Sequence, residues 1–169
     1  MSLASDRYSI PASNTACYVS GVDDADKTFM DRAIVQALKS AGERGVPVGA
    51  ALSWRGTLVS EGHNRREQDR NVTSHGETDC LKNAGLFGRW HETTLYTTLS
   101  PCMMCAGSVV QFKIPRIVIA DNVNFGGNED FLRSRGVQVD ILPDETMIAF
   151  FADWKKRFPD VWNGGSGPR

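Results

Sequence analysis

Two short segments of the chain carry side chains that could hold a metal ion and move a proton. The first reads H-G-E from His75 to Glu77, and the second reads P-C-M-M-C from Pro101 to Cys105. Residues three apart on a helix share a face, so Cys102 and Cys105 can point at one ion. Free N–H groups and the positive end of the helix dipole lower the pKa of a thiol in the first turn. They therefore favour the thiolate, which is the form that binds zinc.

His75 supplies a third ligand from the start of a different expected helix. Three protein ligands leave the fourth tetrahedral position open, which is typical of catalytic rather than structural zinc. We therefore expect one Zn²⁺ per chain, held by His75, Cys102 and Cys105, with the pKa of its water lowered to about 7. Glu77 stands two residues from His75, and in a first turn both side chains reach a target beyond the helix end. Glu77 is thus the expected catalytic proton carrier.

Each motif alone also has a less specific interpretation. A C-x-x-C pair can be a redox pair or half of a structural zinc site, and an H-x-E can be an ordinary surface pair. The redox interpretation expects a thioredoxin-like context, and a structural site expects a second Cys/His pair, yet the sequence has no other C-x-x-C. In combination and in this order, the motifs match the pattern of zinc deaminases. We expect the two remaining cysteines, Cys17 and Cys80, to be free thiols.

The elements that would position these residues alternate along the chain. Helical periodicity and β-forming runs predict five strands, at Val46–Trp54, Thr57–Gly62, Thr94–Leu99, Arg116–Ala120 and Val137–Leu142. The predicted helices are Asp23–Ser40, a helix capped by Thr73 or Ser74 that runs to Ala84, Cys102–Phe112, Glu129–Ser134 and Asp144–Arg157. This order predicts an α/β fold with helices on both faces of a central sheet. We expect a flexible N-terminal extension over residues 1–22, one domain over 23–163 and a flexible tail over 164–169.

Length and composition bound the classes of protein that fit. With 169 residues, 41% hydrophobic and 23% charged, the chain suits one ordinary globular domain. A formal net charge of −1 and an isoelectric point near 6.3 give no general attraction for nucleic acid or anionic membranes. No apolar run reaches the length of about 18 residues that predicts a membrane span, and no secretion signal is recognisable at the N-terminus. We expect a cytoplasmic protein without nucleic-acid or membrane partners.

At these motifs the sequence resembles the cytidine deaminase superfamily, and within it the fungal-type cytosine deaminases. The likeness covers about Asp23 to Trp162 and is carried by GVPVGAAL, GHNRR, SHGE and TTLYTTLSPCMMCAGSVVQFKIPRIVIADNVNF. The chain is similar, more weakly, to tRNA-adenosine and guanine deaminases, which usually carry H-A-E in place of H-G-E. The resemblance implies a three-layer α/β/α sandwich with a five-stranded mixed sheet, assembled as a homodimer. It also implies hydrolytic deamination of a small free nucleobase, first of all cytosine to uracil.

The resemblance implies substrate contacts for five residues. Asn64 would hydrogen-bond the ring through its side-chain amide, the N–H of Gly76 would hold the ring carbonyl oxygen, and a carbonyl near Ser100 would accept from the departing amine. Phe125 and Trp162 would close over the base and leave no room for ribose. From the residues alone, Asn64 also fits a turn, and the two aromatic side chains fit ordinary packing.

Two departures from the fungal pattern leave the exact base open. The acidic residue that follows the closing Trp falls at Gly165 here, and the pair between the cysteines is Met103-Met104 where the fungal motif begins with Asp. Losing a buried hydrogen-bonding partner costs on the order of 1–3 kcal/mol, which is enough to reverse a preference. Isocytosine or another related heterocycle, including guanine, is therefore an alternative substrate to cytosine.

Two other functions fit the same motifs less well. A tRNA adenosine deaminase would need a basic stripe, and the only candidate clusters are Arg65-Arg66 and the run from Lys155 to Arg157. A non-catalytic zinc-binding module would have no use for an intact Glu77.

Overall fold

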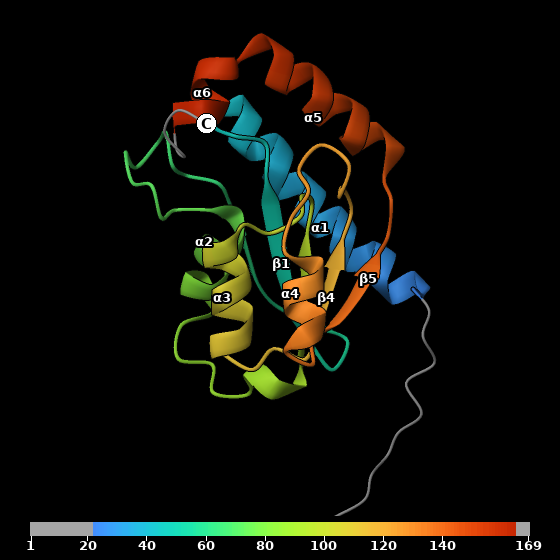
Figure 1. Cartoon of the computed structure of the whole chain (residues 1–169). Coiled ribbons are helices and arrows are strands. Elements are labelled where there is room, and N and C mark those ends of the chain that lie inside the picture. Colours follow the sequence, from blue (N-terminus) through green and yellow to red (C-terminus); the bar gives the residue numbers. More distant parts are fainter. Residues whose placement is uncertain (1–21, 165–169) are drawn as a thin grey trace, which may run out of the picture.

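We describe residues 22–164 from a computed structural model of the chain (Figure 1). Five strands form one mixed sheet: β1 (Gly49–Trp54), β2 (Thr57–His63), β3 (Thr93–Thr97), β4 (Arg116–Ile119) and β5 (Gln138–Ile141). Their order across the sheet is β2-β1-β3-β4-β5. β1 pairs antiparallel with β2 and β3, whereas β3, β4 and β5 run parallel. The expected five-stranded mixed sheet is confirmed.

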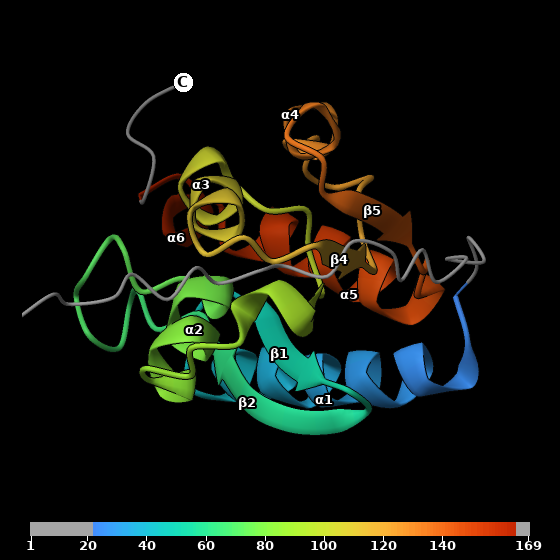
Figure 2. The same cartoon turned by 90° about the horizontal axis from the view of Figure 1, so that it is seen from below.

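Helices cover both faces of this sheet. They are α1 (Asp24–Gly42), α2 (Gly76–Ala84), α3 (Met103–Gln111), α4 (Glu129–Ser134), α5 (Glu145–Arg157) and α6 (Pro159–Gly164), with a short 3₁₀ turn η1 (Trp90–Glu92) before β3. Figures 1 and 2 show α2, α3 and α4 on one side of the sheet and α1 and α5 on the other. The three-layer α/β/α arrangement is therefore present.

The strands divide their apolar side chains between the two faces by simple alternation, because successive residues of a strand point to opposite sides. One face packs against α2, α3 and α4 through Ala50, Leu52, Leu95, Ile117 and Ile119. The other face packs against α1 through Ala51, Tyr96, Val118 and Ala120. Both faces of the sheet are buried. A shift of one residue in the pairing would move every side chain to the other face, so burial fixes the register of each strand and with it the positions of the loops at the strand ends.

A buried ionic network ties α1 to the middle of the sheet. Asp26 forms a capping box with Asp23 at the start of α1, accepts from the hydroxyl of Tyr96 at 2.8 Å and pairs with Arg116 at 2.6 Å. Arg116 also binds Asp140 of β5 at 2.7 Å. Burial by itself would raise the pKa of Asp26, but the hydrogen bonds from Arg116, Asp23 and Tyr96 outweigh it and hold that pKa below its ordinary value.

The structure corrects four details of the sequence prediction. The first strand begins at Gly49, because Val46 and Val48 form a tight turn joined by a 2.7 Å backbone hydrogen bond. Neither Thr73 nor Ser74 caps the second helix: its N-cap is His75, whose N–H donates to the hydroxyl of Thr78 at 2.9 Å.

The third detail is the 3₁₀ turn η1, which the sequence analysis did not predict, and the fourth is the C-terminal end. A further helix, α6, follows α5, and Gly164 is its last residue rather than the start of a tail. Cys80 is a buried free thiol, as expected. Cys17, the N-terminal extension and the remaining C-terminal residues lie outside the described part of the chain. Within that part, no helix combines the length and the apolar character needed to cross a bilayer.

Candidate active site

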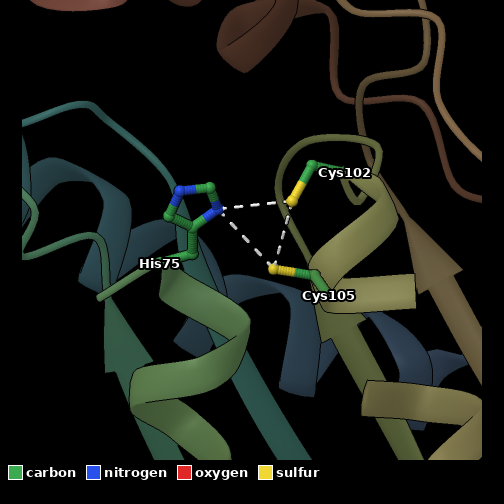
Figure 3. A group of neighbouring side chains, drawn as sticks. All are labelled: His75, Cys102 and Cys105. Atoms are coloured by element: carbon green, nitrogen blue, oxygen red, sulfur yellow. Dashed lines mark hydrogen bonds between the residues drawn. The ribbon is translucent and has the colours of Figure 1, made fainter. Parts of the chain in front are cut away.

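The two motifs meet where α2 and α3 begin. His75 is the N-cap of α2 and Cys102 is the N-cap of α3, with Cys105 one turn further along α3. Figure 3 shows the three side chains pointing toward one another across the gap between the helices. Nδ1 of His75 lies 3.5 Å from Sγ of Cys102 and 3.6 Å from Sγ of Cys105, and the two sulfur atoms are 3.7 Å apart.

This spacing is that of a tetrahedral zinc site. With Zn–S near 2.3 Å and Zn–N near 2.0–2.1 Å, tetrahedral angles require roughly 3.7 Å between two sulfur ligands and roughly 3.6 Å between sulfur and nitrogen. The three observed separations match these values, and the donor set of one imidazole and two thiols is one that zinc prefers. Three ligands leave a fourth position for water or substrate, as the sequence predicted.

Hydrogen bonds among the three ligand side chains shift their pKa values, and the shifts favour a thiolate at Cys102. Hydrogen bonds from Cys105 and His75 outweigh burial and lower the pKa of Cys102 to about 4, so this thiol is the first to ionise. The hydrogen bond to Cys102 raises the pKa of His75, and the hydrogen bond to Cys102 together with burial raises that of Cys105. Because zinc binds thiolate and neutral imidazole, its binding would release the protons that these groups hold.

Glu77 lies directly beside the three ligands but is not one of them. Its side chain is fully enclosed, with Oε2 3.4 Å from Sγ of Cys105 and Oε1 3.4 Å from the hydroxyl of Thr97. Burial is the main cause that raises the pKa of Glu77. A carboxyl group with a raised pKa holds a proton more readily than an ordinary one and can still return it, which is what general acid–base chemistry needs.

A small cavity of about 70 Å³ opens onto the metal ligands. Its polar lining comes from Asn64, Arg66, His75, Glu77, Ser100 and Cys102, and its apolar lining from Val46, Val48, Leu99, Phe125 and Trp162. Phe125 and Trp162 meet edge to face with centroids 5.9 Å apart, and Trp162 also packs on Phe151 of α5 at 5.3 Å. The structure thus brings Asn64, Ser100, Phe125 and Trp162 to one cavity with His75, Glu77 and Cys102.

Gly76 is the one proposed substrate contact that does not line the cavity, and it lies just behind the cavity wall. A Cβ at this position would stand 3.0 Å from the carbonyl oxygen of Val48, so the helix start packs tightly against a lining residue. Glycine leaves room for this close packing.

Arg66 is the lining residue that sequence reasoning missed. The pair Arg65-Arg66 was a candidate for a basic surface, but only Arg65 is at the surface, where it binds Asp69 at 3.0 Å. Arg66 is buried, and its guanidinium donates to the main-chain carbonyl of Val161 near the C-terminal end of α6. A cation is favourable at that end of a helix, so Arg66 anchors the helix that carries Trp162. No local signal distinguishes Arg66 from its solvated neighbour.

Comparisons with known proteins agree with this geometry. A family model described as the cytidine and deoxycytidylate deaminase zinc-binding region matches residues 23–121. A cytosine deaminase of Candida albicans is 41% identical over 145 residues, spanning 84% of this chain and 97% of that protein. A tRNA-specific adenosine deaminase of Streptococcus pyogenes is 32% identical over 123 residues, spanning 70% of this chain and 73% of that protein.

A solved structure from work on tRNA:A34 deaminases superposes with a TM-score of 0.65 at 27% identity, covering 74% of this chain and 99% of that one. The family match spans both motifs, and the ligand separations fit the metal that the family binds. The chain therefore belongs to the cytidine and deoxycytidylate deaminase family, and it is a zinc-dependent hydrolytic deaminase.

Proposed function

We propose that this enzyme deaminates free cytosine to uracil and releases ammonia. The observation that carries the proposal is the size and lining of the cavity: the metal ligands and a buried carboxyl group face a space comparable to one six-membered ring. The similarity to the Candida albicans cytosine deaminase over most of both chains supports the same substrate.

The residues of the chain divide the chemistry among them. Zinc held by His75, Cys102 and Cys105 would supply a water activated for attack at neutral pH. Glu77 takes the proton of the attacking water and returns it to the amine that leaves, so one buried carboxyl group serves both halves of the reaction. The hydroxyl of Thr97, which donates to the carbonyl of Leu99 at 3.0 Å, also lies 3.4 Å from Oε1 of Glu77, and Oε2 lies 3.4 Å from Sγ of Cys105.

Asn64 is placed to recognise the ring. Its Oδ1 accepts from the backbone N–H of Arg66 at 3.1 Å, which fixes the orientation of the amide group. The hydroxyl of Ser40 donates to the carbonyl of Asn64 at 2.7 Å and holds the backbone. With the oxygen engaged, the Nδ2 of Asn64 is free to donate to an acceptor atom of a bound base. Across the cavity, a carbonyl at Ser100 would accept from the amine.

Isocytosine and guanine are the alternative substrates, because glycine occupies position 165, where the fungal pattern carries an acidic contact. Adenosine in tRNA is a weaker alternative, since the cavity of about 70 Å³ lined by Phe125 and Trp162 is small for a base that carries a ribose and its chain. Ammonia release from cytosine, isocytosine, guanine and adenine tests the proposal. Cytosine should be the best substrate, and preferred turnover of another base would refute it.

We further propose a cytoplasmic homodimer. Helices α2 and α3 leave an apolar groove between them, lined in part by Leu81 and Trp90, and its edge carries a fully exposed Leu86 and a partly exposed Phe112. Exposed apolar patches of this kind mark protein–protein contacts. Light scattering should give twice the chain mass, and Leu86→Asp should lower it; a monomer at micromolar concentration would contradict the proposal.

A further inference from the structure

At Ser100, in the wall of the cavity, the hydrogen-bond donors are all bonded to acceptors of the protein itself. The backbone N–H of Ser100 donates to the carbonyl of Asp121 at 2.8 Å. The hydroxyl of Ser100 donates to Oε1 of Glu129 at 2.5 Å. The next residue, Pro101, has no N–H at all. Ser100 is buried and lines the cavity, and because both of its donors are engaged, the hydrogen-bonding capacity left to this turn is that of its oxygen lone pairs.

The loop after β4 makes this arrangement. Asn128 donates from Nδ2 to the carbonyl of Pro101 at 2.9 Å, next to the contact between Glu129 and Ser100. Gly127 closes the space between them, because a Cβ there would lie 2.0 Å from the hydroxyl oxygen of Ser100. Residues 127–129 therefore clamp the Ser100-Pro101 turn through both of its residues.

The hydroxyl is the only donor of the turn that a ligand could recruit, and Glu129 determines where it points. The O–H to carboxylate bond is short and charge-assisted, so it is stronger than a neutral hydrogen bond to a ligand. Among residues 22–164, no donor reaches the carbonyl oxygen of Ser100, which leaves that acceptor available to a bound base.

We infer that Glu129 sets the hydrogen-bonding polarity of the Ser100-Pro101 turn, so that the cavity wall accepts from an amine but donates nothing to a carbonyl oxygen. The inference deepens the proposed function and rests on it. The deamination replaces an amino group, which is a donor, by a carbonyl oxygen, which is an acceptor. An acceptor-only wall therefore attracts the substrate and repels the product at the same position. Glu129 is a positioning residue in this account, since it acts through Ser100.

The consequence is a site built to release its product. If Glu129 is replaced by alanine, the hydroxyl of Ser100 loses its acceptor and can rotate to donate to a carbonyl oxygen in the cavity. One neutral hydrogen bond gained in this way changes a dissociation constant by about two- to tenfold. Uracil should therefore bind more tightly to Glu129→Ala, whereas the KM for cytosine should not fall.

The test measures the dissociation constant of uracil by calorimetry and its inhibition constant against cytosine, with the zinc-loaded full-length chain. Glu129→Ala should bind uracil about two- to tenfold more tightly than the wild type. Glu129→Gln keeps an acceptor oxygen and should stay near the wild-type value. In the background of Ser100→Ala, adding Glu129→Ala should bring no tightening, because the hydroxyl is absent.

Asp130→Ala is the matched control, since Asp130 is the neighbouring carboxylate on α4, is fully exposed and pairs only with Arg133. A loop that is merely loosened would weaken cytosine and uracil alike in Glu129→Ala, and that result would overturn the inference. Equal uracil binding by all variants, or none by any, would overturn it too. Uracil is the product from both cytosine and isocytosine. If the variants bind uracil as expected but the wild type does not turn over cytosine, only the proposed substrate is refuted, and the inference about Glu129 stands.

Discussion

Replacing Glu77 with glutamine removes the one carboxyl group among the described residues that line the cavity, at almost constant size. The other ionisable groups of the lining are His75 and Cys102, which hold the metal, and Arg66, which is bound to α6. None of them can replace Glu77 as a carrier of protons. The variant should therefore lose turnover without a substitute pathway inside the cavity.

The magnitude follows from the two steps that Glu77 serves. Proton transfer by a placed side chain contributes about 10²–10⁴ in rate. A group that serves both the attacking water and the leaving amine belongs at the upper end, so we expect kcat to fall by about 10⁴, or about 5 kcal/mol. Zinc content should not change, because the three ligand atoms, which lie 3.5, 3.6 and 3.7 Å from one another, belong to other residues than Glu77.

Ammonia release under saturating substrate, with metal analysis of the same sample, measures both quantities. Asp79→Asn is a suitable control: Asp79 is also a buried carboxylate on α2, but it accepts from the backbone N–H of His63 outside the cavity. It should retain activity within a few-fold. If Glu77→Gln with full zinc turned over within tenfold of the wild type, the proton-carrier role would be refuted.

Three further predictions concern the metal, the roof and the fold. Metal analysis should find one zinc per chain in active enzyme, and a chelator should abolish activity until zinc is restored; two ions per chain, or activity without zinc, would contradict the site. Trp162→Ala should lower kcat/KM for cytosine at least tenfold with zinc retained, whereas Phe158→Ala, which is partly exposed and away from the cavity, should have little effect. Arg116→Met should destabilise the fold by about 3 kcal/mol, because it leaves Asp26 buried without its partner. The pKa of Asp26 lies below its ordinary value of 3.8, so the stability that this ionised carboxylate contributes should be complete above about pH 4 and be lost as the pH falls further. Urea unfolding should therefore show that the difference in unfolding free energy between wild type and Arg116→Met becomes smaller in acid.

The zinc ligands could be predicted from the sequence because their chemistry is local. Cys102 and Cys105 are brought together by one helical turn, and His75 lies at the start of another helix, so motif spacing indicates all three. The β-forming runs predicted the sheet equally well, since strands whose two faces are both buried are apolar along most of their length. These signals do not depend on distant parts of the chain.

What the sequence did not reveal depends on tertiary contacts. Helix α6 begins at Pro159, directly after α5, and its six residues have too short an apolar pattern to predict a helix. Its position depends on Arg66, which comes from a loop 95 residues earlier. Likewise, Thr73 and Ser74 are good capping residues by type, yet His75 occupies the N-cap, where its Nδ1 faces Sγ of Cys102 on a distant helix.

A roofed, zinc-dependent site that acts on a free base should reject the corresponding nucleoside. The most direct test compares kcat/KM for cytosine with that for cytidine, using the full-length zinc-loaded enzyme. The cavity of about 70 Å³ under Phe125 and Trp162 leaves no room for ribose, so cytosine should be turned over at least a hundredfold more efficiently, about 2.7 kcal/mol in transition-state binding. Turnover of cytidine equal to or better than that of cytosine would contradict the roofed site and the free-base assignment together.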